Sequence, residues 1–246
     1  MLKGFEQAQK FGRSFMLPIA ILPAAGLLLG IGGSLSNPET VRTYSFLNIF
    51  FLQSVFKIMS ASGSIIFSNL APIFSIGIAV GLAKSDKGTS GIAAFIGYLV
   101  MNATIGVLID VSGRAESFSS GAVGFVLGIK TLETGVFGGV VVGILTYYLH
   151  SRFNKVDLPK VLGFFSGSRF VPIIVSFSSI FLAVIMFLVW PFVQSGINKV
   201  GGLVDSTGYI GTLIYGIFFK DAWTFWSSSY ILFAILDNRP WGICYY

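Results

Sequence analysis

Charged residues are scarce in this chain of 246 residues, in which only 11% are Asp, Glu, Lys or Arg and 54% are hydrophobic. About a quarter of the residues of a soluble domain are charged, so the composition excludes an ordinary soluble globular protein. Lys and Arg exceed Asp and Glu and give a net charge of +6. Because the basic residues stand singly or in short loops and form no stripe, nucleic acid is not an expected partner. The composition predicts a protein whose solvent is the lipid bilayer.

Cysteine, histidine and catalytic motifs are also nearly missing. A single cysteine, Cys244, excludes an internal disulfide and a thiolate metal site made within the chain. The sequence has no Walker loop, HExxH motif, nucleophile elbow or paired-carboxylate pattern. We therefore expect no catalytic residue, metal ion or cofactor. The only histidine, His150, ends an apolar run beside Arg152 and is expected to be a solvated residue at the membrane boundary.

Long apolar runs are what the sequence does contain, and a membrane helix needs about 20 mostly apolar residues. The expected crossings are Phe15–Ile31, Ile65–Ala83, Gly91–Ile109, Gly135–Leu149 and Phe170–Val193, with a sixth run, Gly208–Phe219, that is too short to cross unaided. Leu2–Phe11 mixes apolar and polar residues as a short interfacial helix does. Tyr44–Met59 either lies at the interface or adds a crossing. The sequence predicts an all-α polytopic membrane protein.

The distribution of basic residues predicts the orientation, because the loops on the cytoplasmic side of a membrane protein are enriched in Lys and Arg. With the N-terminus inside and five crossings, nine basic residues are inside, namely Lys3, Lys10, Arg13, Lys84, Lys87, Arg152, Lys155, Lys160 and Arg169. Five are outside, namely Arg42, Lys57, Arg114, Lys130 and Lys199. A cytoplasmic N-terminus is the favoured arrangement.

Prolines and amides within the apolar runs predict where helices bend or are joined. Pro18 and Pro23 each remove a backbone donor, so the first crossing is expected to be bent and packed against neighbours. Asn69 and Asn102 are expected to cap or cross-link helices, with contact to a sugar as the alternative.

Glycines spaced by four residues recur in the apolar runs, where small residues let helix backbones approach closely. The sets are Gly26 and Gly30, Gly77 and Gly81, and Gly135, Gly139 and Gly143. Packing within the chain is the favoured interpretation, and a subunit contact is the alternative.

Several stretches resemble the membrane subunit, IIC, of the glucose superfamily of bacterial sugar phosphotransferase systems. They are GRSFMLPIAILPAAGLLLGIG (12–32), NLAPIFSIGIAVGLAKSDKG (69–88), AAFIGYLVM (93–101), ETGVFGGVVVGILTYYLHSRF (133–153) and LPKVLGFFSGSRFVPII (158–174). Together they cover residues 5–220 in the order and spacing of the family. The segment around GIKTLETG is more similar to the maltose and glucose branch than to the N-acetylglucosamine branch.

The resemblance implies a homodimeric permease in the bacterial inner membrane, whose first half is the scaffold and dimer contact. It implies that the second half holds the sugar, glucose or maltose, and that a phosphocysteine on a IIB domain phosphorylates it after phosphate arrives through IIA. Intact members thus take part in a phosphotransferase activity whose reactive cysteine lies in IIB. Lys220 stands where the family has an arginine near the sugar and is the one expected substrate-binding residue, although Phe219 replaces the usual acidic neighbour.

The tail KDAWTFWSSSYILFAILDNRPWGICYY (220–246) departs from the family, which continues here as YGxxxRxLxPFGLHHI. If the codons after Lys220 are read one base later, the genetic code admits K-M-L-G-P-F-G-L-H-H-I. We therefore divide the chain into a partial IIC domain, residues 1–220, and an out-of-frame tail, residues 221–246. The expected product is an inactive fragment of the permease. Alternatives are a dimerisation fragment that pairs with full-length permease and an unrelated secondary transporter, whose inverted repeats are not visible.

Overall fold

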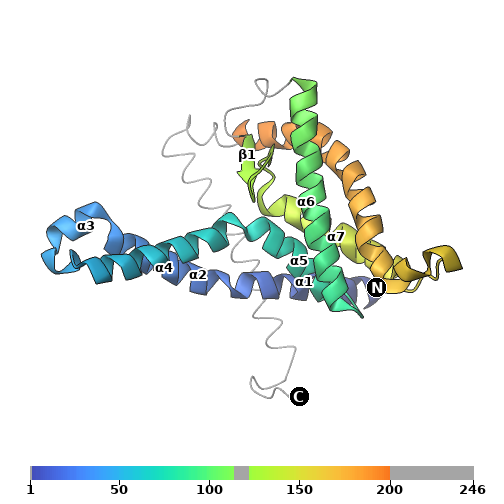
Figure 1. The fold of residues 1–246 in the computed structure, drawn as a ribbon, viewed down its shortest axis with the longest axis horizontal. Coiled ribbons are helices and arrows are strands. Elements are labelled where there is room, and N and C mark those ends of the chain that lie inside the picture. Colours follow the sequence, from blue (N-terminus) through green and yellow to red (C-terminus); the bar gives the residue numbers. More distant parts are fainter. Residues whose placement is uncertain (1, 114–121, 200–246) are drawn as a thin grey trace, which may run out of the picture. The chain divides into compact units, whose positions relative to one another are not determined.

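The computed structural model describes residues 2–113 and 122–199, and nearly all of them are helical (Figure 1). The chain divides into two compact units, Met1–Pro191 and Phe192–Tyr246. The helices are α1 (Leu2–Ala20), α2 (Leu22–Ser36), α3 (Pro38–Thr43), α4 (Phe50–Ser68), α5 (Leu70–Leu82), α6 (Lys87–Ser112), α7 (Gly135–Phe153) and a further helix over 170–199. Short 3₁₀ turns lie at Ser45–Leu47, Lys160–Phe165 and Gly167–Arg169. The strands β1 (Val123–Val126) and β2 (Ile129–Leu132) form one hairpin.

Four helical segments are long and apolar enough to cross a membrane: Gln9–Ser36, Phe50–Ser68, Lys87–Ser112 and Gly167–Lys199. Leu70–Leu82 is a shorter apolar helix. The molecule is therefore an all-α polytopic membrane protein with one small hairpin. Three of the expected crossings, beginning at Phe15, Gly91 and Phe170, fall within these segments.

The first candidate span is broken where the two prolines predicted a bend. Helix α1 ends at Ala20 and α2 begins at Leu22, with Ile21 between them. Pro23 takes one of the first positions of α2, where its missing N–H has no helical partner to lose. The short interfacial helix expected over Leu2–Phe11 is not a separate element, because α1 runs through it without a break.

The crossing expected over Ile65–Ala83 is wrong, because a helix break at Asn69 divides it. Nδ2 of Asn69 donates a hydrogen bond to the Ile65 carbonyl at 2.7 Å, which caps the end of α4 as the sequence predicted. Pro72 explains why the helix stops, since a proline cannot donate to the carbonyl four residues earlier. The apolar run over Tyr44–Met59 belongs mostly to α4, which supports the interpretation that it adds a crossing.

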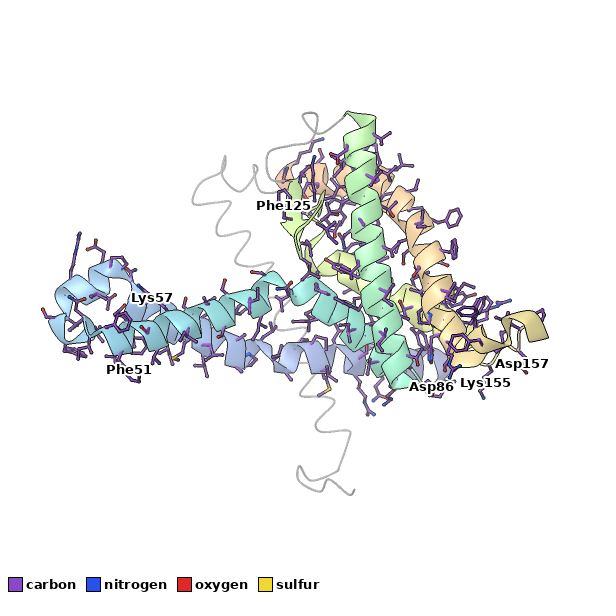
Figure 2. All side chains as sticks on the ribbon, in the orientation of Figure 1. Phe51, Lys57, Asp86, Phe125, Lys155 and Asp157 are labelled. Carbon is purple, nitrogen blue, oxygen red and sulfur yellow. The ribbon has the colours of Figure 1, made fainter. Side chains whose placement is uncertain are left out.

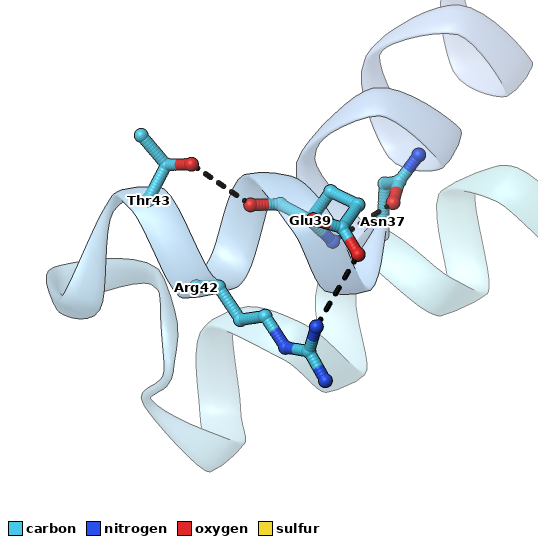
Figure 3. Close-up of polar contacts among 4 residues, drawn as sticks. All are labelled: Asn37, Glu39, Arg42 and Thr43. Carbon is cyan, nitrogen blue, oxygen red and sulfur yellow. Dashed lines mark hydrogen bonds and ion pairs between the residues drawn. The ribbon is translucent and has the colours of Figure 1, made fainter.

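Helices α2 and α4 pack along each other and are joined through α3 (Figure 1). The polar side chains of α3 and of its N-cap make contacts with one another and with the backbone of α3, as Figure 3 shows. Oδ1 of Asn37 accepts from the Glu39 amide at 3.0 Å, and the Thr43 hydroxyl donates to the Glu39 carbonyl at 3.0 Å. Arg42 pairs with the Glu39 carboxylate at 3.4 Å. Because both side chains of that pair are exposed, it contributes little to stability.

Glycines allow the close helix contacts, although not at every predicted position. A Cβ at Gly63 of α4 would lie 2.5 Å from the Leu29 amide nitrogen and 2.7 Å from the Ala25 carbonyl oxygen of α2. Gly32 of α2 likewise faces the α4 backbone at Ser60. Gly26 and Gly30 have open space around them, so the expectation that they pack within the chain is wrong among the described residues.

In the other two glycine sets, every member except Gly135 packs within the chain, as the sequence predicted. Gly77 and Gly81 of α5 lie against Pro18 and Ser14 of α1. Gly139 and Gly143 of α7 lie against backbone carbonyls of α5, and a Cβ at Gly143 would be 2.9 Å from the Ser75 carbonyl oxygen. Gly135, at the start of α7, has no atom within 4 Å of a Cβ but adopts a positive φ of 51°. Helix α5 is thus held between α1 and α7.

Candidate functional site

Lys220, the expected substrate-binding residue, lies outside the described residues, as do Phe219, Cys244 and the run Gly208–Phe219. Its role therefore stays a prediction. The structure does describe the polar groups of the helices that precede it. They form a polar join between α6 and the hairpin, and a set of buried groups on α7 and on the helix over 170–199.

The polar join begins with Asn102, which is buried in the middle of α6. Its Nδ2 donates to the Tyr98 carbonyl at 2.7 Å, and its Oδ1 accepts a hydrogen bond from the Thr131 hydroxyl of β2 at 2.9 Å. Both side chains are closed to solvent. The sequence-based expectation that Asn102 cross-links elements is confirmed, but its partner is a strand and not a helix.

Two further positions of α6, each one turn beyond the last, complete the join. Gly106 faces the Lys130 carbonyl so closely that any side chain would collide with it. One turn further, the Asp110 carboxylate accepts from Nζ of Lys130 at 2.7 Å. The spacing of four residues puts all three positions on one face of the helix, so β2 is attached along that face. Nε1 of Trp190 donates to the Glu133 carbonyl at 3.1 Å. This hydrogen bond joins the residue after β2 to the helix over 170–199.

Three buried side chains of the described residues have an atom without a hydrogen-bond partner: Thr146, His150 and Ser179. Thr146 and His150 are four residues apart and share a face of α7. Ser179 lies where Gly97 of α6 meets the helix over 170–199, because a Cβ at Gly97 would be 2.9 Å from the Ser179 hydroxyl. Buried polar groups are usually paired, so an ordered water or a ligand hydroxyl would satisfy each of these atoms. The spacing of Thr146 and His150 was visible in the sequence, but the approach of Ser179 was not.

The expectation of a solvated His150 is wrong, since only 2% of the residue is exposed. The loop between α5 and α6 covers it, and the imidazole hydrogen-bonds the backbone of Asp86. Burial lowers the pKa of His150, and the nearby Asp86 carboxylate and this hydrogen bond partly oppose that effect. Asp86 itself has a positive φ of 45°, a conformation that is uncommon for residues other than glycine. The last turn of α7 therefore supports a specific shape of this loop.

The same end of the molecule collects loops that the positive-inside rule placed on one side. Nδ2 of Asn154, just after α7, donates to the Ser85 hydroxyl at 3.0 Å and joins the two loops. Figure 2 labels Asp86, Lys155 and Asp157 at this end. The exposed basic residues of these loops and of the helix ends beside them are Lys84, Lys87, Arg152, Lys155 and Arg169. A surface of this charge suits acidic or phosphate-bearing partners.

Among residues 2–113 and 122–199, no group of three or more His, Cys, Asp and Glu side chains could hold a metal ion. The buried polar side chains described above are hydroxyls, one amide and one imidazole, groups that hydrogen-bond neutral polyols and water.

Comparison with protein families gives these helices a context. The family model described as "Phosphotransferase system, EIIC" matches residues 12–225, which is most of the chain and includes all of the candidate spans except the first three residues of Gln9–Ser36. This range contains the polar join, the buried groups on α7 and on the helix over 170–199, the basic loops and the position of Lys220. A family of this kind implies a multi-pass membrane protein that handles a sugar together with IIA and IIB phosphocarriers. The chain belongs to the phosphotransferase system EIIC family and is a sugar permease component of that system.

Proposed function

We propose that this EIIC chain belongs to the glucose and maltose branch and that the sugar it serves is glucose or maltose. The match to the family over residues 12–225 carries the proposal. The branch rests on the likeness of GIKTLETG, residues 128–135, to that branch. In the intact permease the bound sugar receives its phosphate from the phosphocysteine of IIB on the cytoplasmic side.

The proposed location is the bacterial inner membrane, with the N-terminus in the cytoplasm. The hydrogen bond between Asn154 and Ser85 supports this, because it joins two loops that the positive-inside rule assigns to the cytoplasm. The surface formed by these loops would face the phosphate-bearing carriers.

The proposed oligomeric state is a homodimer, with the open face of α2 as part of the contact. Gly26 and Gly30 have no atom within 4 Å of a Cβ, so one strip of α2 is free for close approach by another helix. Small residues at this spacing favour such contacts in membranes. A Gly26→Leu and Gly30→Leu double variant should weaken dimer cross-linking in membranes, whereas Gly88→Leu, which also has open space, should not.

Residues 221–246 are proposed to be out-of-frame translation, and this chain is proposed to be inactive on its own. The support is the shifted reading K-M-L-G-P-F-G-L-H-H-I, which restores the pattern of the family after Lys220. Lys220 is proposed to contact the sugar in a permease whose reading frame is intact. Resequencing the locus tests the frame directly: an unbroken series of codons with no GLHH reading in another frame would contradict it.

The functional test uses bacteria that contain the general phosphocarriers but lack their own glucose and maltose permeases. Cells with the present gene should accumulate no radiolabelled sugar phosphate, and cells with the locus restored by one base after the codon for Lys220 should accumulate it. Lys220→Ala in the restored gene should raise the KM for sugar. If the restored gene supports uptake of neither glucose nor maltose but of another sugar, the proposed branch is wrong and the family assignment stands.

The open face of α2 also favours a second candidate function, a non-catalytic fragment that pairs with full-length permease. Expressing the present chain together with the restored gene should then lower uptake. The Gly26→Leu and Gly30→Leu changes in the fragment alone should reverse this inhibition. Inhibition that persists unchanged would contradict pairing through α2.

A further inference from the structure

The connection between α7 and the helix over 170–199 exposes two neighbouring aromatic rings. Phe164 is 72% exposed and Phe165 is 42% exposed. The two rings contact edge to face, with centroids 5.3 Å apart. Rings that pack mainly on each other leave most of their apolar area without a protein partner in the described chain. Such an exposed apolar surface indicates contact with another protein or with lipid.

The connection, residues 154–169, is a closed and ordered loop, which we call the aromatic-basic loop. The Gly167 amide donates to the Val156 carbonyl at 2.9 Å, and the Leu158 amide donates to the Ser166 hydroxyl at 3.0 Å. At its base, the rings of Phe153 and Phe170 contact with centroids 6.1 Å apart and join the ends of the two helices. The exposed rings are therefore presented by a fixed scaffold.

Arg169 is placed directly on the exposed rings. Its guanidinium carbon lies 5.0 Å from the centroid of Phe164, and Nη1 donates to the Phe164 carbonyl at 3.3 Å. The residue is exposed, and the ion pairs found among the described residues do not include it. Because a guanidinium has five N–H donors, most remain available to an oxyanion while the contact with the ring fixes its position.

The surroundings of the loop add positive charge where the candidate span Gly167–Lys199 begins. The helix over 170–199 belongs to a candidate span. The end of α7 lies beside the start of that helix, because Phe153 and Phe170 are in contact. Among the described side chains, the exposed charged residues of this loop, of the last turn of α7 and of the adjoining residues 84–87 are Lys84, Lys87, Arg152, Lys155 and Arg169 against Asp86 and Asp157, which gives five positive and two negative charges. Clusters of basic residues at such ends recognise anionic lipid headgroups.

We propose that the aromatic-basic loop binds the headgroup of an anionic phospholipid. Arg169 and Lys155 contact the phosphate, and the rings of Phe164 and Phe165 enter the boundary between headgroups and acyl chains. A lipid fits better than an acidic protein, because one molecule supplies both the negative charge that Arg169 lacks and the apolar surface that the rings lack. The loop also leads directly into a candidate membrane span, Gly167–Lys199, so it meets headgroups whether or not a protein is bound.

The test places a reporter in the loop by Phe164→Trp, which preserves an aromatic ring beside Arg169. The full chain is reconstituted in nanodiscs that contain either brominated phosphatidylglycerol or brominated phosphatidylcholine, and fluorescence of the unsubstituted chain is subtracted. Quenching by the anionic lipid should exceed quenching by the zwitterionic one. Excess inorganic phosphate should not remove the difference, because a free ion cannot replace the acyl contact.

Charge variants in the Phe164→Trp background identify the residues responsible. Arg169→Gln and Lys155→Gln should each lower the preference for phosphatidylglycerol about five-fold, which corresponds to about 1 kcal/mol for a basic residue near the surface. Arg169→Lys should retain most of the preference even if the ring contact weakens, and so separates charge from local structure. Arg42→Gln is the matched control, because Arg42 is exposed and pairs with Glu39 in α3, and it should change nothing.

The proposal would be overturned if the two lipids quenched the tryptophan equally and if Lys155→Gln left that quenching unchanged. It would also be overturned by a tryptophan that neither lipid quenches but whose emission shifts when purified IIB is added, since the loop would then be a docking surface for protein. These readouts do not use sugar uptake, so they stand apart from the proposed function.

Discussion

The contact between α2 and α4 permits a sharp test of the packing, because two glycines in these helices differ only in what surrounds them. Gly63 of α4 faces the backbone of α2, and Gly30 of α2 faces open space. Alanine at either position gains helix propensity, about 1 kcal/mol relative to glycine. Only alanine at position 63 also meets atoms of the facing helix. The two substitutions therefore separate packing from propensity.

The expected magnitude follows from the distances. A Cβ at Gly63 would lie 2.5 Å from the Leu29 nitrogen, whereas ordinary contact begins at 3.4 Å. The shortfall is the difference of these values, 0.9 Å, and it involves backbone that cannot rotate away. Overpacking of this kind costs about 1–3 kcal/mol, and the backbone contact favours the upper part of that range. After the gain in propensity, Gly63→Ala should lower the free energy of unfolding by about 1–2 kcal/mol.

Gly30→Ala should leave the free energy of unfolding unchanged or raise it by up to about 1 kcal/mol. Reversible unfolding of the purified chain in mixed micelles, followed by far-ultraviolet circular dichroism, measures both variants. Their free energies of unfolding should differ by about 1–3 kcal/mol. Equal values for the two variants would refute the close approach of α4 to α2.

Three further predictions concern polar groups. Asn102→Leu or Thr131→Val should each lower the free energy of unfolding by about 1–3 kcal/mol, because the remaining partner is left buried and unpaired. In the same unfolding assay, the double variant should lose less than the sum of the two single losses. Asp110→Asn should cost less than about 1 kcal/mol, an effect that shrinks in high salt, because its ion pair with Lys130 is exposed; a large loss that does not depend on salt would contradict this. Because burial lowers the pKa of His150, the folded protein binds a proton more weakly than the unfolded chain does. The free energy of unfolding should be highest at pH values above the ordinary imidazole pKa of about 6.5 and should decrease as the pH falls below that value. In melting curves recorded from pH 8 to pH 5, His150→Gln should make this decrease smaller.

The sequence predicted the membrane class and the parts of the fold that depend on local chemistry. Apolar runs identified most helices, and Pro18 and Pro23 located the break between α1 and α2. The prediction of one crossing over Ile65–Ala83 is wrong because mean hydropathy carries no information about a helix cap at Asn69 or about the missing backbone donor of Pro72. Both residues are visible in the sequence, so the break could have been predicted from turn chemistry.

Contacts between distant parts of the chain could not be predicted in the same way. His150 is buried by a loop more than sixty residues earlier in the sequence, and no local pattern indicates that cover. Spacing by four residues identifies helix faces that carry small residues, but it does not identify the helix that packs on them. Gly26 and Gly30 were therefore predicted to make the close helix contact within the chain that Gly32 and Gly63 make. Asn102 was correctly predicted to cross-link, while its partner Thr131 depends on the hairpin folding back on α6.

We have proposed that this chain, a sugar permease component, does not hold the sugar on its own. Equilibrium binding of radiolabelled glucose and maltose to the purified, reconstituted chain tests it most directly. We expect no saturable binding to the present chain and saturable binding to the product of the restored reading frame. Saturable, micromolar binding of either sugar to the present chain would contradict the account.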